Sequence, residues 1–197
     1  MRAFWRVPDL ELHVLLAGHE AKTSVKSFNG AELKTHASFD ELADKKIDVL
    51  FVPGGGDAYI KGATSDAKLL EFVRHHAGDA QWVASVCTGA FVLAEAKLLE
   101  TLRATTHWSY LTTFQKRYPN VQIVNGFPRF VFDGKFVTGG GISSGIDQAL
   151  TLAGRIAGDS VGKQIELIIQ YRPQPPYGVG DPSVADFDTY KKVTGGS

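Results

Sequence analysis

The sequence predicts an α/β fold, a flavodoxin-like three-layer sandwich with helices on both faces of a mostly parallel central sheet. Two continuous apolar runs, 47–53 and 81–86, have the composition of strands that are covered on both faces. Each run ends in small residues, and a segment with helical periodicity follows, at 65–78 and at 88–99. This alternation of strand and helix is typical of a doubly wound sheet.

The region before the first apolar run predicts shorter strands. Leu10–Leu16 is the first strand candidate. Two alternating segments follow, 22–28 and 31–39, and an Asn-Gly pair at 29–30 separates them. Because Asn-Gly suits the tight turns that join antiparallel strands, these segments predict a hairpin.

The rest of the chain continues the alternation. The further strands are expected at 121–124, 128–134 and 135–140, with an Asp-Gly turn at 133–134. The helices are expected at 65–78, 88–99, 109–118, 143–158 and 159–171, capped in two cases by Ser65 or Asp66 and by Ser143 or Ser144. Pro and Gly are frequent from Arg172 onward, so we expect one domain over 1–171 and an irregular tail or dimer arm over 172–197.

Composition narrows the class of protein. A length of 197 residues suits one domain, and equal numbers of acidic and basic residues, 21 each, give no reason to expect nucleic acid or a membrane as partner. A single cysteine excludes an internal disulfide and a cysteine-based metal cluster, and it favours a reducing, cytoplasmic compartment. The expected partner is a small-molecule substrate, and the N-terminus has no signal-peptide pattern.

Cys87 is the strongest candidate for a functional residue. It directly follows the apolar run 81–86, and the small residues Thr88 and Gly89 follow it where a helix is expected. Ligands of parallel sheets bind at the carboxyl ends of the strands, and a sharp strand-to-helix turn holds a side chain up into that space. The N–H groups of the helix start favour a thiolate, so the pattern predicts a nucleophile, with a buried structural cysteine as the alternative.

Two glycine-rich loops are expected at the same edge of the sheet. Gly54–Gly56 follows the run 47–53, and one of its N–H groups, with that of Thr88, is a candidate oxyanion hole. Gly139–Gly141 also joins a strand to a helix, and Gly140 is a candidate for contacts in the same cleft. The alternative for both loops is a plain tight turn.

His107 is the histidine best placed to serve a thiol at Cys87, because it follows the helix that begins there. The alternative is a structural histidine bonded to the backbone. The remaining histidines show no spacing that suits a metal, so neither a metal nor a cofactor is expected.

Several motifs, taken in order, resemble those of the ThiJ/PfpI superfamily, with its class I glutamine amidotransferase-like fold. They are DVLFVPGG, SVCTGAFVLAEAKLL, RATTHW and FVTGGGISSGIDQALTLA. The TTHW and TGGGI-x-x-GID segments look most like the branch of isonitrile hydratases, also called cyclohexyl-isocyanide hydratases. The similarity extends over roughly residues 5 to 185, as far as the segment IELIIQYRPQPPYGVGDP.

The resemblance implies a lyase that hydrates an isonitrile to an N-substituted formamide without a cofactor, as a homodimer. Cys87 would attack the isonitrile carbon, Thr88 would contribute its N–H and hydroxyl, and Gly54 and Gly55 would complete a polar pocket. Peptidase-like members carry a histidine where Thr88 stands, which argues against proteolysis. Other activities considered for this superfamily are glyoxalase or deglycase chemistry on reactive carbonyls, and a non-enzymatic cysteine sensor or binding protein.

The same family begins with a strand and helix that carry an acidic partner for the cysteine, in a segment like LDLTGP. No segment of this sequence matches it. The N-terminal strand and helix are therefore expected to be missing, and no residue is assigned to the acid.

Overall fold

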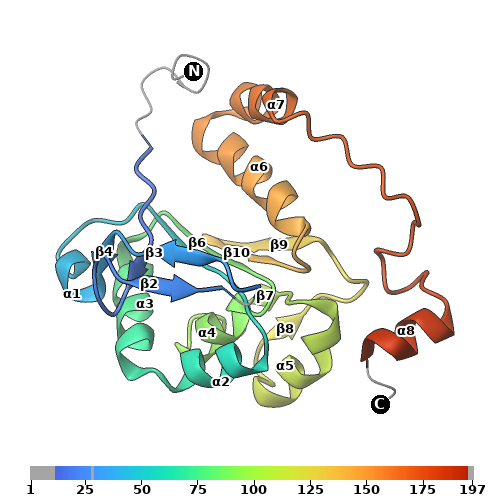
Figure 1. Cartoon of the computed structure of the whole chain (residues 1–197), viewed down its shortest axis with the longest axis horizontal. Coiled ribbons are helices and arrows are strands. Elements are labelled where there is room, and N and C mark those ends of the chain that lie inside the picture. Colours follow the sequence, from blue (N-terminus) through green and yellow to red (C-terminus); the bar gives the residue numbers. More distant parts are fainter. Residues whose placement is uncertain (1–11, 28, 195–197) are drawn as a thin grey trace.

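The computed structural model describes residues 12–27 and 29–194, and a four-stranded sheet lies at its centre (Figure 1). Its strands are β5 (Val49–Val52), β6 (Trp82–Val86), β10 (Phe136–Gly139) and β9 (Phe130–Asp133), in that order across the sheet. The first three are parallel, and β9 is antiparallel to β10 because a tight turn joins them. The predicted α/β fold with a mixed, mostly parallel sheet is confirmed.

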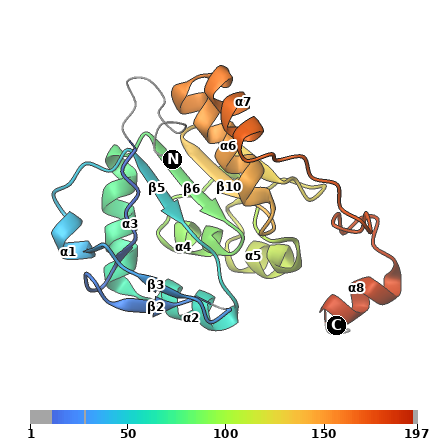
Figure 2. The same cartoon turned by 45° about the horizontal axis from the view of Figure 1, so that its top comes forward.

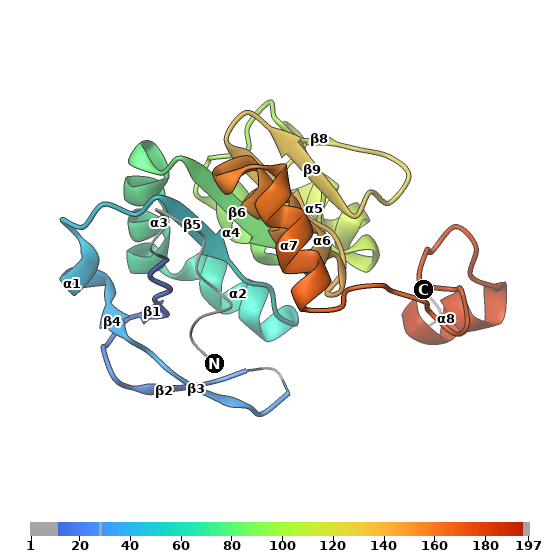
Figure 3. The ribbon, with the colours of Figure 1, turned by 90° about the horizontal axis from the view of Figure 1, so that it is seen from above.

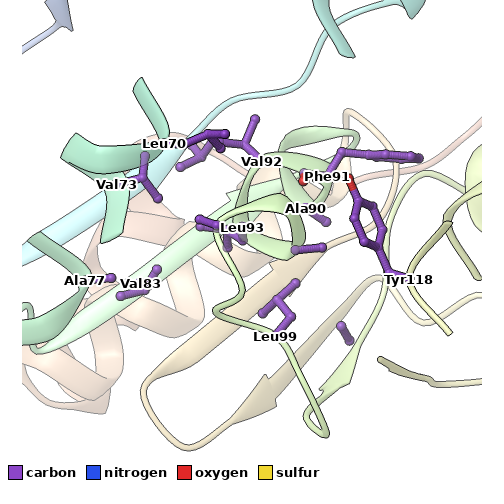
Figure 4. Packing of buried hydrophobic residues seen from close by; sticks show 14 of the residues in the cluster. Leu70, Val73, Ala77, Val83, Ala90, Phe91, Val92, Leu93, Leu99 and Tyr118 are labelled. Carbon is purple, nitrogen blue, oxygen red and sulfur yellow. Dashed lines mark hydrogen bonds between the residues drawn. The ribbon is translucent and has the colours of Figure 1, made fainter. Parts of the chain in front are cut away.

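Helices lie on both faces of this sheet (Figures 2 and 3). One face is covered by α3 (Ala67–Asp79) and α4 (Gly89–Glu95), and the other by α6 (Ser144–Ala157) with α7 (Asp159–Ile168) packed beside it. The main core lies on the first side, where Val83 of β6 packs among the apolar residues of α3 and α4 (Figure 4). Burial of this kind anchors the start of α4 against the sheet.

Short elements complete the described part of the chain. Three strand pairs lie outside the central sheet: β1 (Ala17–Gly18) with β4 (Ala37–Ser38), β2 (Ser24–Lys26) with β3 (Glu32–Lys34), and β7 (Arg103–Ala104) with β8 (Gln122–Ile123). The further helices are α1 (Phe39–Leu42), α2 (Asp57–Ser65), the 3₁₀ helix η2 (Trp108–Tyr110), α5 (Leu111–Arg117) and α8 (Phe187–Thr194).

Both predicted hairpins form. In the first, β2 and β3 pair antiparallel, and Gly30 has a φ of 82° in the turn between them. In the second, Gly134 has a φ of 56° between β9 and β10. Positive φ costs glycine little, so both turns are held by the residue type that suits them. Phe28 lies outside the described residues.

Other boundaries differ from the sequence prediction. The strand predicted over Leu10–Leu16 is wrong for 12–16, which have no regular structure, and pairing begins only at Ala17; residues 10–11 lie outside the described ranges. The end of the segment 31–39 turns into α1, because Ser38 and Glu41 form a capping box there. The helix predicted over 88–99 ends at Glu95, since Lys97 takes a φ of 64°.

Besides α1, two helices of the described residues were not predicted. One is α2, which follows directly on the glycine loop, and the other is α8, which interrupts the predicted irregular tail. Among the cap alternatives, Asp66 caps α3 by accepting the N–H of Leu69 at 3.0 Å. Ser143 holds the cap position of α6 without a side-chain cap bond.

Candidate active site

Cys87 lies in the sharp turn between β6 and α4, which we name the Cys87 elbow (residues 86–89). Its φ is 55°, in the left-handed region that side chains other than glycine rarely adopt. Two neighbours hold this strained backbone: the Cys87 N–H donates to Gly139 O at 3.0 Å, and the Thr106 hydroxyl donates to Cys87 O at 2.8 Å. Strain of this kind, held by surrounding bonds, is found at functional sites and presents the side chain away from the sheet.

The protonation state of Cys87 differs from the expected thiolate. The side chain is half-buried, and burial raises the pKa of the thiol above its ordinary value. A hydrogen bond from the Thr88 N–H opposes this shift without cancelling it. Since α4 is only seven residues long and burial is the largest cause, the helix start does not make a thiolate the resting form.

Thr88 ties the elbow to the glycine loop (Gly54–Gly56). Its hydroxyl donates to Gly55 O at 2.7 Å and accepts the Gly55 N–H at 2.8 Å, while the side chain is fully buried. A Cβ on Gly54 would lie 2.8 Å from the Cβ of Cys87 and 2.8 Å from Thr88 N. The glycine loop therefore lies beside Cys87 as predicted, and the two segments are packed so closely that Gly54 has no room for a side chain.

These bonds change the predicted oxyanion hole. The Gly55 N–H is already used by the Thr88 hydroxyl, and the Gly140 N–H donates to Arg129 O at 2.8 Å. Neither N–H is free to bind a developing anion, so Gly55 is not the loop donor of the predicted oxyanion hole, and a contact of Gly140 in the cleft would not be made through its N–H. Gly54 is the loop residue in direct contact with Cys87.

Replacing Thr88 by valine tests this tie, because valine keeps the shape and removes the hydroxyl. Both Gly55 groups then lose their partner in a buried place, and the free energy of unfolding should fall by about 1–3 kcal/mol in urea denaturation. Thr112→Val, on an exposed position of α5, is the control and should change it by less than about 0.5 kcal/mol. Equal stability of the two variants contradicts the tie.

His107 lies beside the second glycine loop and not on the sulfur. Its Nδ1 accepts the Ser109 N–H at 3.4 Å and contacts the Ser109 hydroxyl at 2.8 Å, which places the ring hydrogen on Nε2. That Nε2 would lie 3.9 Å from a Cβ on Gly141. Burial lowers the pKa of His107, so the ring is neutral at pH 7. Within the described ranges, no hydrogen bond joins His107 to Cys87.

Three polar residues beside the glycine loop, Asp57, Tyr59 and Tyr110, are not among the predicted site residues. The Tyr59 hydroxyl donates to Pro53 O at 2.7 Å, and the Tyr110 hydroxyl donates to Asp57 Oδ1 at 2.7 Å. Burial and then the charge of Cys87 raise the pKa of Tyr59 to about 12. The pKa of Tyr110 is also about 12, chiefly because of Asp57, with burial and Cys87 adding to the shift. The available signal was that Asp57 and Tyr59 directly follow the glycine loop.

A pocket of about 310 Å³ opens beside these residues, between α2 and α5. We name its buried apolar lining residues the floor and its exposed polar lining residues the rim. It is lined by Asp57, Ile60, Lys61, Thr64, Ser65, Phe91, Tyr110, Thr113 and Arg117. Within the part of the chain that the structure describes, no group of three or more His, Cys, Asp or Glu side chains could hold a metal ion. No helix there is long and apolar enough to cross a membrane.

A cysteine in a strained strand-to-helix turn, at the carboxyl end of a parallel strand, defines a structural class of α/β proteins in which a sharp elbow carries a side chain away from the sheet. Residues 2–154 match the model of the DJ-1/PfpI family, and the chain belongs to that family.

Two similar proteins cover most of the chain. An isonitrile hydratase of Pseudomonas putida is 37% identical over 179 residues, which span 91% of this chain and 74% of that protein. The crystal structure of a ThiJ/PfpI family protein from Pseudomonas syringae superposes with a TM-score of 0.84 at 26% identity, covering 93% of this chain and 73% of that one.

Other similarities are more distant. A transcriptional regulator of Pseudomonas aeruginosa, CdhR, is 30% identical over 141 residues, 72% of this chain and 40% of that protein. DJ-1beta of Drosophila melanogaster has a TM-score of 0.70 at 20% identity, over 81% of this chain and 83% of that one, which is a likeness of fold.

Proposed function

We propose that this chain hydrates an isonitrile to an N-substituted formamide, with Cys87 as the nucleophile. The observation that carries the proposal is the strained elbow, where Cys87 contacts both Thr88 and the glycine loop. The 37% identity to an isonitrile hydratase, over 91% of the chain, supports the choice of reaction. The predicted homodimer stays a prediction, and light scattering of the purified protein will test it.

The proposed reaction has three steps. The Cys87 sulfur bonds to the isonitrile carbon and the thiol proton is transferred to that carbon, which gives a thioimidate, R–N=CH–S–Cys87. Water then adds across the C=N bond, with its oxygen on carbon and one proton on nitrogen. The C–S bond breaks, the hydroxyl proton returns to sulfur, and R–NH–CHO leaves. No electron is gained or lost, and the enzyme returns to its thiol form.

The raised pKa of Cys87 suits this reaction. An isonitrile carbon needs a nucleophile and a proton, and a resting thiol carries both. The Thr88 N–H stabilises negative charge on sulfur, so it helps the thiolate to leave in the last step, while the Thr88 hydroxyl holds the glycine loop. Thr88 is therefore assigned a catalytic role together with Cys87.

The raised pKa of Cys87 also argues against the alternative of a non-enzymatic cysteine sensor. Oxidation of cysteine follows its thiolate character, which burial reduces here. The glyoxalase or deglycase alternative also needs Cys87, and the assay below separates it from hydration.

The test is an assay of the purified protein with cyclohexyl isocyanide, in which N-cyclohexylformamide is quantified by mass spectrometry. Steady formation of formamide in proportion to enzyme is the expected result, and heat-denatured protein is the control. A parallel assay measures consumption of methylglyoxal. Methylglyoxal consumption without formamide would replace the proposal by the glyoxalase function, and silence in both assays would overturn both.

Alkylation of Cys87 by iodoacetamide at different pH values tests the raised pKa. As the only cysteine, it reports its own ionisation. The alkylation rate of the folded protein should level off at a higher pH than that of the protein in concentrated urea. The raised pKa also makes stability depend on pH. The contribution of the thiol to the free energy of unfolding is fully present below the pKa that Cys87 has in the unfolded protein, and it is lost as pH rises through the higher pKa of the folded protein. A lower inflection in the folded protein contradicts the assignment.

A further inference from the structure

The pocket between α2 and α5 adjoins the Cys87 elbow, although Cys87 itself does not line it. Asp57 on its rim directly follows the glycine loop that contacts Cys87. Phe91 on its floor lies in the first turn of α4, four residues after Cys87. Tyr110 lines the pocket and packs edge-on against Phe91, with ring centroids 6.1 Å apart. A substrate carbon at the sulfur would therefore have its substituent beside this pocket.

The floor and rim of the pocket differ in chemistry. Ile60 and Phe91 form the floor, and both side chains are buried. Ser65 and Thr113 bring hydroxyls to the rim, while the buried Thr64 hydroxyl already donates to Ile60 O at 2.7 Å. An occupant with a short carbon skeleton and a polar end fits this arrangement.

Most of the charges on the rim already have partners. Arg117 Nη2 donates to Thr64 Oγ1 at 3.0 Å and to Glu95 Oε2 at 2.8 Å, and Asp57 accepts the Tyr110 hydroxyl. The ammonium group of Lys61 has no hydrogen bond or ion pair with any residue in the described ranges. Among the rim residues, Lys61 is thus the cation without a partner in the described ranges, and it lies beside an apolar floor.

We propose that this pocket binds the substituent of the isonitrile substrate, and that the substituent carries a carboxylate that pairs with Lys61. The inference rests on the proposed function, since it names the substrate class of that same site. Ile60 and Phe91 contact the carbon skeleton, and Lys61 with the hydroxyls of Ser65 and Thr113 binds the carboxylate. A cavity of about 310 Å³ is of the size that holds a substituent like an amino-acid side chain with its carboxylate.

The test compares potassium 2-isocyano-3-phenylpropanoate with its neutral methyl ester. The protein should have a kcat/KM at least about fivefold higher for the carboxylate. Lys61→Met should reduce this preference to about one, mainly through KM. Lys116→Met, an exposed lysine of α5 outside the pocket, is the matched control and should keep the preference.

Binding of the product separates this inference from the proposed function. N-formylphenylalanine, the formamide of the same substituent, should bind to Cys87→Ala in calorimetry, and more weakly once Lys61→Met is added. Turnover of cyclohexyl isocyanide with no preference for the carboxylate overturns the pocket assignment and leaves the hydration intact. Lys61-dependent binding without turnover of any isonitrile overturns the hydration and leaves the pocket assignment. Absence of both the preference and the binding overturns the pocket assignment.

Discussion

Cys87→Ala is expected to lower isonitrile turnover by at least about 10³-fold, because the variant lacks the atom that bonds to carbon and the proton that goes with it. The loss should appear in kcat and not as a change of KM alone. Alanine is smaller than cysteine and takes the same backbone at this position, so the fold should survive. Formamide production measured beside circular dichroism checks both statements.

A covalent adduct gives the same prediction a second readout. Acid quenching during turnover should yield protein whose mass is increased by that of one cyclohexyl isocyanide, located at Cys87 by peptide mapping. The alanine variant should carry no such adduct. A Cys87→Ala protein that keeps more than a tenth of the activity would show that the reaction does not pass through the sulfur.

The position of the elbow could be predicted from the sequence because it depends on local patterns. The apolar run 81–86 can only be a buried strand or a buried helix segment, and the small residues after it favour a sharp turn. The same argument placed the glycine loop after 47–53 at the same sheet edge. Parallel pairing of β5 with β6 then brings Gly54 into contact with Cys87.

The charge state and the polar contacts of the site could not be predicted in this way. Whether a helix start or burial decides the pKa of Cys87 depends on the solvent exposure of the folded side chain, which sequence patterns do not give. The pairing of Asp57 with Tyr110 joins residues 53 positions apart in the sequence. The sequence pattern left Gly55 a candidate donor and Gly140 a candidate contact, because the partners of their N–H groups, Thr88 and Arg129, become visible only in the fold.

Gly89→Ala is expected to have the largest effect on stability, because no space exists for a side chain where α4 begins. A Cβ on Gly89 would lie 2.3 Å from Val52 O and 2.8 Å from Pro53 O. Both are backbone atoms at the end of β5, so relief requires α4 to move away from the sheet. The free energy of unfolding should fall by about 3 kcal/mol, measured by urea denaturation.

Gly78→Ala is the matched control, because a Cβ there would meet nothing within 4 Å near the end of α3. This variant should be unchanged or more stable by up to about 1 kcal/mol, since alanine favours a helix over glycine. If Gly89→Ala unfolds at the same urea concentration as Gly78→Ala, the close packing of α4 on β5 is wrong. Cys87 stands two residues before Gly89, so any shift of α4 also displaces the sulfur, and misplacement by about 1 Å can cost 10²-fold in rate. The folded fraction of Gly89→Ala should therefore also be impaired in turnover, which the loss of stability alone would not cause.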